Sequence, residues 1–156
     1  MLFVVLVNFN GWRDTVECID SILQSNYYLF NIVVVDNAST NDSYQKIISW
    51  CQTRDFLLKE QYNSNEGLFV TIFLTNTDQN KNYCNTISII KNTENKGFAA
   101  GNNLGVKYIN QLGLDFDYIW FLNNDTVIDP DAMNYLTQRM SSDKNKEVGI
   151  LGGKLL

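Results

Sequence analysis

Hydrophobic positions follow two different patterns along the chain. Four short runs are apolar at nearly every position, and they cover Leu2–Val7, Phe30–Val35, Thr86–Ile90 and Tyr118–Leu122. Such runs are typical of strands that are buried on both faces, as in parallel sheets. The stretches between these runs carry apolar residues at helical spacing. This alternation predicts a three-layer α/β fold with a mostly parallel sheet.

Two helices are expected in the first third of the chain. One covers about residues 13–25, where one face carries Val16, Ile19, Ile22 and Leu23. The other should begin after Asp42, whose side chain can cap the first turn. Its buried face is expected to contain Tyr44, Ile47, Ile48 and Cys51.

Two more helices are expected in the second half of the chain. The first runs from Gly97 to about Gln111, and one face carries Ala100, Leu104 and Tyr108. Asp129 is expected to cap the other, with Pro130 at its first position, where proline loses no hydrogen bond. Val148–Leu151 has the composition of a final short strand.

Residues 52–85 follow neither pattern. Leu68–Leu74 predicts a strand, whereas the residues around it are rich in Asn, Gln, Thr and Asp. We therefore expect residues 1–156 to form a single domain with an insertion near residues 52–85, which forms a hairpin or an edge strand.

Composition and charge exclude several classes of function. The net charge is −5, which disfavours binding to nucleic acid. The sequence contains no histidine, so it cannot build a Ser-His-Asp or Cys-His mechanism, and any metal would be a hard ion on oxygen ligands. No apolar run approaches the roughly 20 residues of a membrane span. Three widely spaced cysteines argue against a disulfide scaffold and fit a reducing cytosol.

Each of the four expected parallel strands ends in a cluster of polar residues. The clusters are Asn8–Asn10, Asp36–Asn37, Asn92–Lys96 and Asn123–Asp125. One such cluster alone is more typical of a turn, because Asn and Asp favour turns. In an open parallel sheet, however, the carboxyl ends of the strands share one rim, and ligands bind beyond that rim. Four clusters on one rim therefore indicate a binding site.

The sequence around these clusters resembles the ordered motifs of family 2 glycosyltransferases. The similar segments are LVNFNG (residues 6–11), VVVDNAST (33–40), NKGFAAGNNLG (95–105) and FLNNDT (121–126). The resemblance covers most of residues 2–153 apart from the insertion. It is strongest to the rhamnosyltransferase-like branch, which acts in the biosynthesis of bacterial cell-surface polysaccharides.

The resemblance implies a GT-A fold and an inverting transfer of a sugar from a UDP- or dTDP-sugar donor to a polysaccharide or glycolipid acceptor. It also implies Mg²⁺ or Mn²⁺ as cofactor and a cytoplasmic location, and it allows the full-length enzyme to associate peripherally with the inner face of the cell membrane. The acceptor would be a saccharide or a lipid-linked saccharide. The chain would then be the N-terminal donor-binding part, truncated before the acceptor-binding part, and inactive alone.

The resemblance also implies roles for residues at the first two strand ends. Asp36 corresponds to the acid that accepts a hydrogen bond from N3–H of uracil or thymine. Phe9 corresponds to an aromatic residue that packs near the base, although it could equally be a core aromatic. Asn8 and Asn10 flank Phe9 and are expected to belong to the same nucleotide-binding site.

At the third strand end, Gly97 begins a glycine-rich loop and helix that let a ligand approach closely. A helix N-terminus attracts the charge of a phosphate. Asn103, in this helix, is expected to belong to the nucleotide-binding site, and many relatives carry an arginine before its position, where this chain has Asn102. Lys96 could supply the missing positive charge, although a solvated surface lysine is slightly the commoner case.

Asn123, Asn124 and Asp125 replace the Asp-x-Asp motif of the family. Asp125 is the expected metal ligand, Asn123 stands where the family has its first acid, and Asn124 could contact the ribose. With one carboxylate, the metal site would be completed by diphosphate oxygens and water. The catalytic base that inverting transfer needs is expected beyond Leu156.

Two other functions fit parts of this pattern. The chain could be a nucleotide-binding module that has the fold without catalysis. A nucleotidyltransferase is the second alternative, but such an enzyme should carry a glycine-rich, basic loop after its first strand, where this chain has Asn8–Trp12 with only Arg13 nearby. A nicotinamide dehydrogenase is disfavoured because no Gly-x-Gly-x-x-Gly follows the first strand.

Overall fold

The computed structural model describes residues 1–54, 56–64, 68–75, 85–142 and 149–152. The strands are β1 (Leu2–Asn8), β2 (Phe30–Asp36), β3 (Leu57–Asn63), β4 (Phe69–Leu74), β5 (Thr86–Lys91) and β6 (Tyr118–Leu122). The helices are α1 (Trp12–Leu23), α2 (Ser43–Thr53), α3 (Phe98–Gln111) and α4 (Ala132–Ser141).

The strands form one mixed sheet in the order β3-β4-β5-β2-β1-β6. The four strands β5, β2, β1 and β6 are mutually parallel, which confirms the predicted parallel core. In the stretch without a clear pattern, β3 and β4 form an antiparallel hairpin, and β4 adds it to the sheet by pairing antiparallel with β5. The predicted strand Leu68–Leu74 is thus β4.

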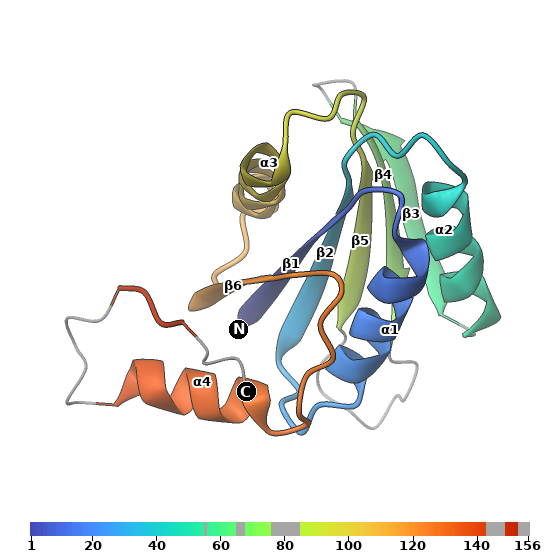
Figure 1. Cartoon of the computed structure of the whole chain (residues 1–156). Coiled ribbons are helices and arrows are strands. Elements are labelled where there is room, and N and C mark those ends of the chain that lie inside the picture. Colours follow the sequence, from blue (N-terminus) through green and yellow to red (C-terminus); the bar gives the residue numbers. More distant parts are fainter. Residues whose placement is uncertain (55, 65–67, 76–84, 143–148, 153–156) are drawn as a thin grey trace.

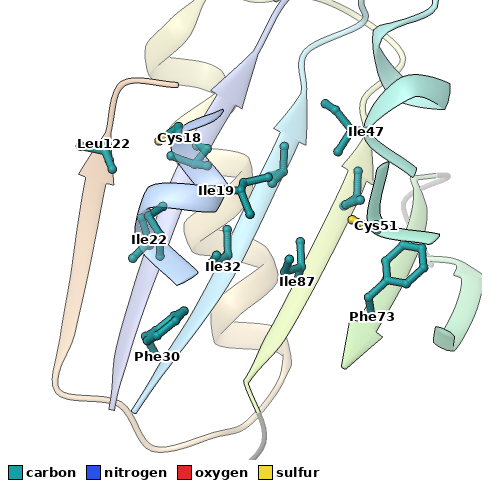
Figure 2. Packing of buried hydrophobic residues seen from close by; sticks show 14 of the residues in the cluster. Cys18, Ile19, Ile22, Phe30, Ile32, Ile47, Cys51, Phe73, Ile87 and Leu122 are labelled. Atoms are coloured by element: carbon teal, nitrogen blue, oxygen red, sulfur yellow. The ribbon is translucent and has the colours of Figure 1, made fainter. Parts of the chain in front are cut away.

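Helices cover both faces of the sheet, so the predicted three-layer α/β fold is confirmed (Figure 1). Helices α1 and α2 lie on one face, where Ile19 and Ile22 of α1 and Ile47 of α2 pack against Ile32 and Ile87 of the strands (Figure 2). Helix α3 lies on the opposite face. Strands β1 and β2 are buried on both faces, which explains why they are apolar at nearly every position.

The buried face of α3 differs from the predicted one. Ala100 and Leu104 are only partly buried, whereas Gly101, Gly105, Tyr108 and Ile109 are buried. The two glycines face β1, and a Cβ on Gly101 would lie 2.8 Å from Cγ1 of Val7. Helix α3 therefore approaches the sheet through residues without side chains, a face that hydrophobic spacing alone does not reveal.

Strand β6 is not the fully buried strand that its apolar sequence predicted. Among the described strands it pairs only with β1, at one edge of the sheet (Figure 1). Tyr118, Ile119 and Trp120 are half-buried, and Phe121 is 50% exposed. The prediction failed because a strand's sequence does not tell how many neighbours the strand has.

The two predicted helix caps need correction. Asp42 precedes α2, but its side chain makes no cap hydrogen bond and instead lies 3.7 Å from Nζ of Lys46. Asp129 accepts a hydrogen bond from the backbone N–H of Asp131, and this turn delays the start of α4 to Ala132. In both places the aspartate stabilises a turn or an ion pair close to the helix rather than the helix terminus itself.

The prediction of a final strand is wrong for residues 149–151. Of Val148–Leu151, Val148 lies outside the described residues, and residues 149–151 form no strand. The side chain of Ile150 is 92% exposed, so apolar composition did not lead to burial here. Among the described helices, none has the length and apolarity that crossing a membrane requires.

Candidate functional site

The predicted rim exists, because the carboxyl ends of the four parallel strands lie at one edge of the sheet. Asn8 of β1 and Lys91 of β5 are both in register with Asp36 of β2, the strand between them. Residues that are in register on neighbouring parallel strands point to the same face. Here that is the face covered by α1 and α2, so the apolar core on that face ends in a polar row.

Asp36 is the centre of a hydrogen-bond network. Its Oδ1 accepts bonds of 2.6 Å from Nδ2 of Asn8 and 2.6 Å from Oγ of Ser39, and its Oδ2 accepts a longer bond of 3.3 Å from the backbone N–H of Ser39. The residue is 1% exposed. Because a carboxylate can accept about four hydrogen bonds, Oδ2 keeps acceptor capacity for a further donor.

Asn8 holds this carboxylate in place and is itself fully buried. Its Oδ1 accepts hydrogen bonds from the backbone N–H of Gly11 and from the hydroxyl of Thr15, at 3.2 and 3.0 Å. A backbone N–H only donates, so this contact fixes which end of the amide is oxygen and directs Nδ2 toward Asp36. Asn8 therefore contributes to the site by orienting the Asp36 carboxylate. A direct contact between Asn8 and a nucleotide stays a prediction.

Two loops of the rim contain non-glycine residues with positive φ. These are Asn10, with φ 60°, and Ala38, with φ 58°. The loops are bonded to each other: the backbone N–H of Asn10 donates to Oγ of Ser39, and Oδ1 of Asn10 accepts from the backbone N–H of Thr40. Such conformations cost of order 1–3 kcal/mol and cluster at functional sites. Ser39 lies within the VVVDNAST motif, but its bond to Asp36 was not predicted.

The ends of β2 and β5 are joined by amide side chains. Nδ2 of Asn37 donates to Oδ1 of Asn95 at 2.9 Å and to the carbonyl of Gly97, and Nδ2 of Asn92 donates to Oδ1 of Asn37 at 3.0 Å. Asn37 is 2% exposed. The start of α3 is thereby fixed relative to Asp36.

The turn before α3 depends on Gly97. Its φ of 91° and ψ of 172° belong to a region that essentially only glycine occupies. No side chain caps the N-terminus of α3, and Phe98 in its first turn is 51% exposed. Lys96 is exposed and its Nζ lies 3.0 Å from Oε2 of Glu94, so the predicted phosphate-binding lysine is paired on the surface.

In the Asn-Asn-Asp segment after β6, one side chain is bonded to α1 and the other two face outward. Nδ2 of Asn124 donates to Oγ1 of Thr15 at 2.9 Å, whereas Asn123 and Asp125 have exposed side chains. No cluster of three or more Cys, Asp or Glu side chains that could hold a metal exists in the described part of the chain. A hard cation at Asp125 would need its other oxygen ligands from a bound ligand, amide oxygens or water.

Two other predicted site residues lie at the surface. Phe9 is 47% exposed, so it is not the core aromatic that was the alternative interpretation, and Asn103 is exposed on α3. A cavity of about 650 Å³ lies elsewhere, between β6, α4 and the segment 149–152. None of the predicted site residues lines it. The candidate site is therefore a rim of polar side chains, separate from this cavity.

Comparisons with known proteins point to one family. The sequence model described as "Glycosyl transferase family 2" matches residues 3–69 and 77–150. Among curated proteins, none is significantly similar in sequence to the chain.

Solved structures share the fold at low sequence identity. A mannosyltransferase, PcManGT from Pyrobaculum calidifontis in complex with GDP-Man and Mn²⁺, has a TM-score of 0.64 and 15% identity over 91% of this chain. Residues 1–349 of S. aureus TarS have a TM-score of 0.58 and 14% identity over 89%. A complex of the same TarS segment with UDP-GlcNAc has a TM-score of 0.58 and 15% identity. The fold is therefore the predicted GT-A fold. The chain covers 32% of the first two of these proteins and 30% of the third, about a third of their length.

Proposed function

This chain belongs to glycosyl transferase family 2, and we propose that its polar rim binds a UDP- or dTDP-sugar together with a divalent cation. The observation that carries the proposal is the convergence of the four family-like motifs. Asn8, Asp36, Asn95 and Asn124 come from four separate segments and belong to hydrogen-bond networks at one edge of the sheet. Ligands of open parallel sheets bind beyond that edge.

We propose that Asp36 recognises the base. A carboxylate accepts a hydrogen bond from N3–H of uracil or thymine, whereas cytosine has no such proton. Oδ1 of Asp36 is occupied by two protein donors, so the base would bond Oδ2, which has one long contact. Phe9 is exposed on the adjacent strand end and offers an aromatic surface to the base.

The diphosphate would lie between the start of α3 and the segment after β6. The uncapped N-terminus of α3 favours negative charge. Lys96 can move from Glu94 to a phosphate, because both side chains are about two-thirds exposed. Gly97 lies at the start of α3 and the exposed Asn103 lies within it, while Asn10 lies on the loop between β1 and α1.

Asp125 is the residue that would hold Mg²⁺ or Mn²⁺, with Asn123 as a neutral neighbour. The donor set fits a hard cation, because only oxygen ligands are available and no histidine or thiolate competes. When bound, the cation would neutralise charge that develops on the departing diphosphate. Asn124 keeps its Oδ1 for the ribose, since its Nδ2 donates to Thr15.

For the whole protein we propose an inverting hexosyltransferase that transfers the sugar to a saccharide or a lipid-linked saccharide. The rhamnosyltransferase-like motifs support a role in cell-surface polysaccharide biosynthesis. A cytoplasmic location, with association at the inner face of the membrane, would match a lipid-linked acceptor. These are proposals from the resemblance, and none of the described residues is assigned as catalytic base.

Calorimetric titration with UDP, dTDP and CDP tests the base-binding proposal. UDP or dTDP should bind in the presence of Mn²⁺, and Asp36→Ala should weaken that binding by about 1.5–3 kcal/mol, the range for a hydrogen bond to a charged group. Asp115→Ala, on an exposed loop, is the control and should bind as the wild type does. A preference for CDP, or unchanged UDP affinity in the Asp36 variant, would refute the role of Asp36.

A further inference from the structure

The segment that contains Asn123 and Asp125 is attached to α1 by a ladder of small polar side chains. Oγ of Ser21 accepts from the backbone N–H of Ile128 at 3.1 Å, and Oγ of Ser25, just after α1, donates to the carbonyl of Pro130 at 3.0 Å. At the top of the ladder, Oγ1 of Thr15 accepts from Nδ2 of Asn124. These contacts fix the path of the chain from β6 to α4.

Thr15 differs from the other steps because it also contacts Asn8 at the end of β1. Its side chain is fully buried, and Oγ1 lies 3.0 Å from Oδ1 of Asn8 and 3.0 Å from the carbonyl of Gly11. The hydroxyl has one proton and accepts from Asn124, so it can accept and donate at the same time. A buried hydroxyl is unfavourable without partners; here it accepts from Asn124, and its single proton is shared between Oδ1 of Asn8 and the carbonyl of Gly11.

The result is one continuous chain of hydrogen bonds that joins the segment after β6, α1, β1 and β2. It runs from Asn124 to Thr15 at 2.9 Å, from Thr15 to Asn8 at 3.0 Å, and from Asn8 to Asp36 at 2.6 Å. Its two ends are the residue beside Asp125 and the carboxylate proposed to bind the base. Thr15 is the link that belongs to neither strand end, and no sequence motif had identified it.

We infer that Thr15 is a positioning residue that aligns the metal-binding end of the rim with the base-binding end. This inference rests on the proposed function. Without the hydroxyl, Asn124 loses the partner of its Nδ2, and the segment with Asp125 is held less firmly where a diphosphate would meet it. Asp36 keeps Asn8 and Ser39, and Asn8 keeps its bond from the backbone of Gly11, so the base-binding end changes little.

The test compares Thr15→Val, which removes the hydroxyl and keeps the shape, with Thr15→Ser, which keeps the hydroxyl. Calorimetry gives the Kd of UDP with and without Mn²⁺, and the ratio of the two measures the enhancement by the metal. Thr15→Val should lower that enhancement about fivefold, the ratio that corresponds to one neutral hydrogen bond, while the metal-free Kd changes less than twofold. Thr15→Ser should retain the enhancement, as should the control Thr53→Val on α2.

A second, metal-free readout addresses the hydrogen bond itself. In urea denaturation, Thr15→Val and Asn124→Ala should destabilise the protein non-additively, since both remove the same bond. If Thr15→Val does not fold, Thr15→Ala replaces it in both experiments. A general loss of folding would lower stability without changing the enhancement by Mn²⁺. A positioning role would change the enhancement, so the two measurements together separate these explanations.

The outcomes separate the inference from the proposed function. Full enhancement in Thr15→Val, or an equal loss in Thr15→Ser, would overturn the positioning role while the nucleotide site stands. A wild-type chain that binds UDP without any enhancement by Mn²⁺ would overturn the role as well, and with it the metal site. Absence of UDP binding in the wild type would overturn the proposed function and this inference together.

Discussion

Gly105 of α3 lies so close to Val5 of β1 that a Cβ on the glycine would be 2.7 Å from Cγ1 of the valine. This contact sets how near α3 can lie to the sheet, and the start of α3 forms one side of the rim. Glycine in a helix is usually less stable than alanine by roughly 0.5–1 kcal/mol. Here the helix tolerates that loss because no other residue fits.

Gly105→Ala should therefore destabilise the protein by about 1–3 kcal/mol, the usual effect of overpacking a core. Urea denaturation measures the change. Gly113→Asn is the control, because Gly113 has φ 63°, which asparagine tolerates, and has open space around it. Adding Val5→Ala should relieve the clash and reduce the effect of Gly105→Ala. Equal stability of Gly105→Ala and the wild type would show that α3 can move away freely.

Asn8→Ala should destabilise the fold through Asp36. The substitution removes the 2.6 Å bond to a buried carboxylate, and a hydrogen bond to a charged group contributes about 1.5–3 kcal/mol. Chemical denaturation at neutral pH gives the difference, with Asn110→Ala on the exposed side of α3 as the matched control. An effect no larger than that of the control would mean that water replaces Asn8 at no loss.

Glu94→Gln should strengthen UDP binding. Glu94 competes with phosphate for Lys96, since their charged atoms lie 3.0 Å apart on the surface. Removing that negative charge frees the lysine, and we expect a gain of a few tenths of a kcal/mol, on the scale of exposed ion pairs. Lys96→Gln should weaken binding, and added salt should reduce both effects. Lys59→Gln, on the edge strand β3, is the control. If Glu94→Gln weakened binding, Lys96 would not be the phosphate ligand.

The protein should lose stability at alkaline pH. Burial raises the pKa of the Cys18 thiol to about 12, and burial raises that of Cys51 to about 12 as well. Unfolded thiols ionise near their ordinary pKa of about 8.5 to 9, while the folded ones stay protonated. The contribution of each thiol is thus complete below about pH 9 and is lost as the pH rises toward 12.

At pH 10 the loss should be on the order of 1 kcal/mol for each thiol. Urea denaturation at pH 7.5 and pH 10 measures it, and Cys51→Ala should show a smaller decrease than the wild type. Burial also raises the pKa of Tyr44, so tyrosines contribute to the loss of stability at alkaline pH. Because both proteins contain the same tyrosines, comparing them removes that contribution. Identical decreases in the two proteins would contradict a buried, protonated Cys51.

The strands of the parallel core could be predicted because each is buried between two helical layers and needs apolar residues on both faces. Features that depend on tertiary neighbours could not. The glycine face of α3 has no hydrophobic period, and Phe121 is apolar although it lies on an edge strand. Asp42 looks like a helix cap but lies beside Lys46, because the sequence does not tell which of several partners a carboxylate takes.

The candidate site, like the fold, could be predicted from the sequence only in part. Strand-end polar clusters placed Asp36 and Asp125 at one rim because all parallel strands end there, and their roles in binding stay predictions. The sequence did not reveal Thr15, since a threonine on a helix face is ordinary and its partners are distant in the chain. It also did not show that Asn8 would be buried and would donate a hydrogen bond to the carboxylate of Asp36.

The central claim is that the rim binds nucleotide and metal together, and the UDP affinity of the wild type and of Asp125→Asn, measured with and without Mn²⁺, tests it most directly. In the wild type, Mn²⁺ should strengthen UDP binding by about 1–3 kcal/mol, because the diphosphate completes the shell around the ion at Asp125. Asp125→Asn should lose this enhancement and keep most of the metal-free affinity, while Asp115→Asn should behave as the wild type does. Equal UDP affinity of the wild type with and without Mn²⁺ would contradict the account.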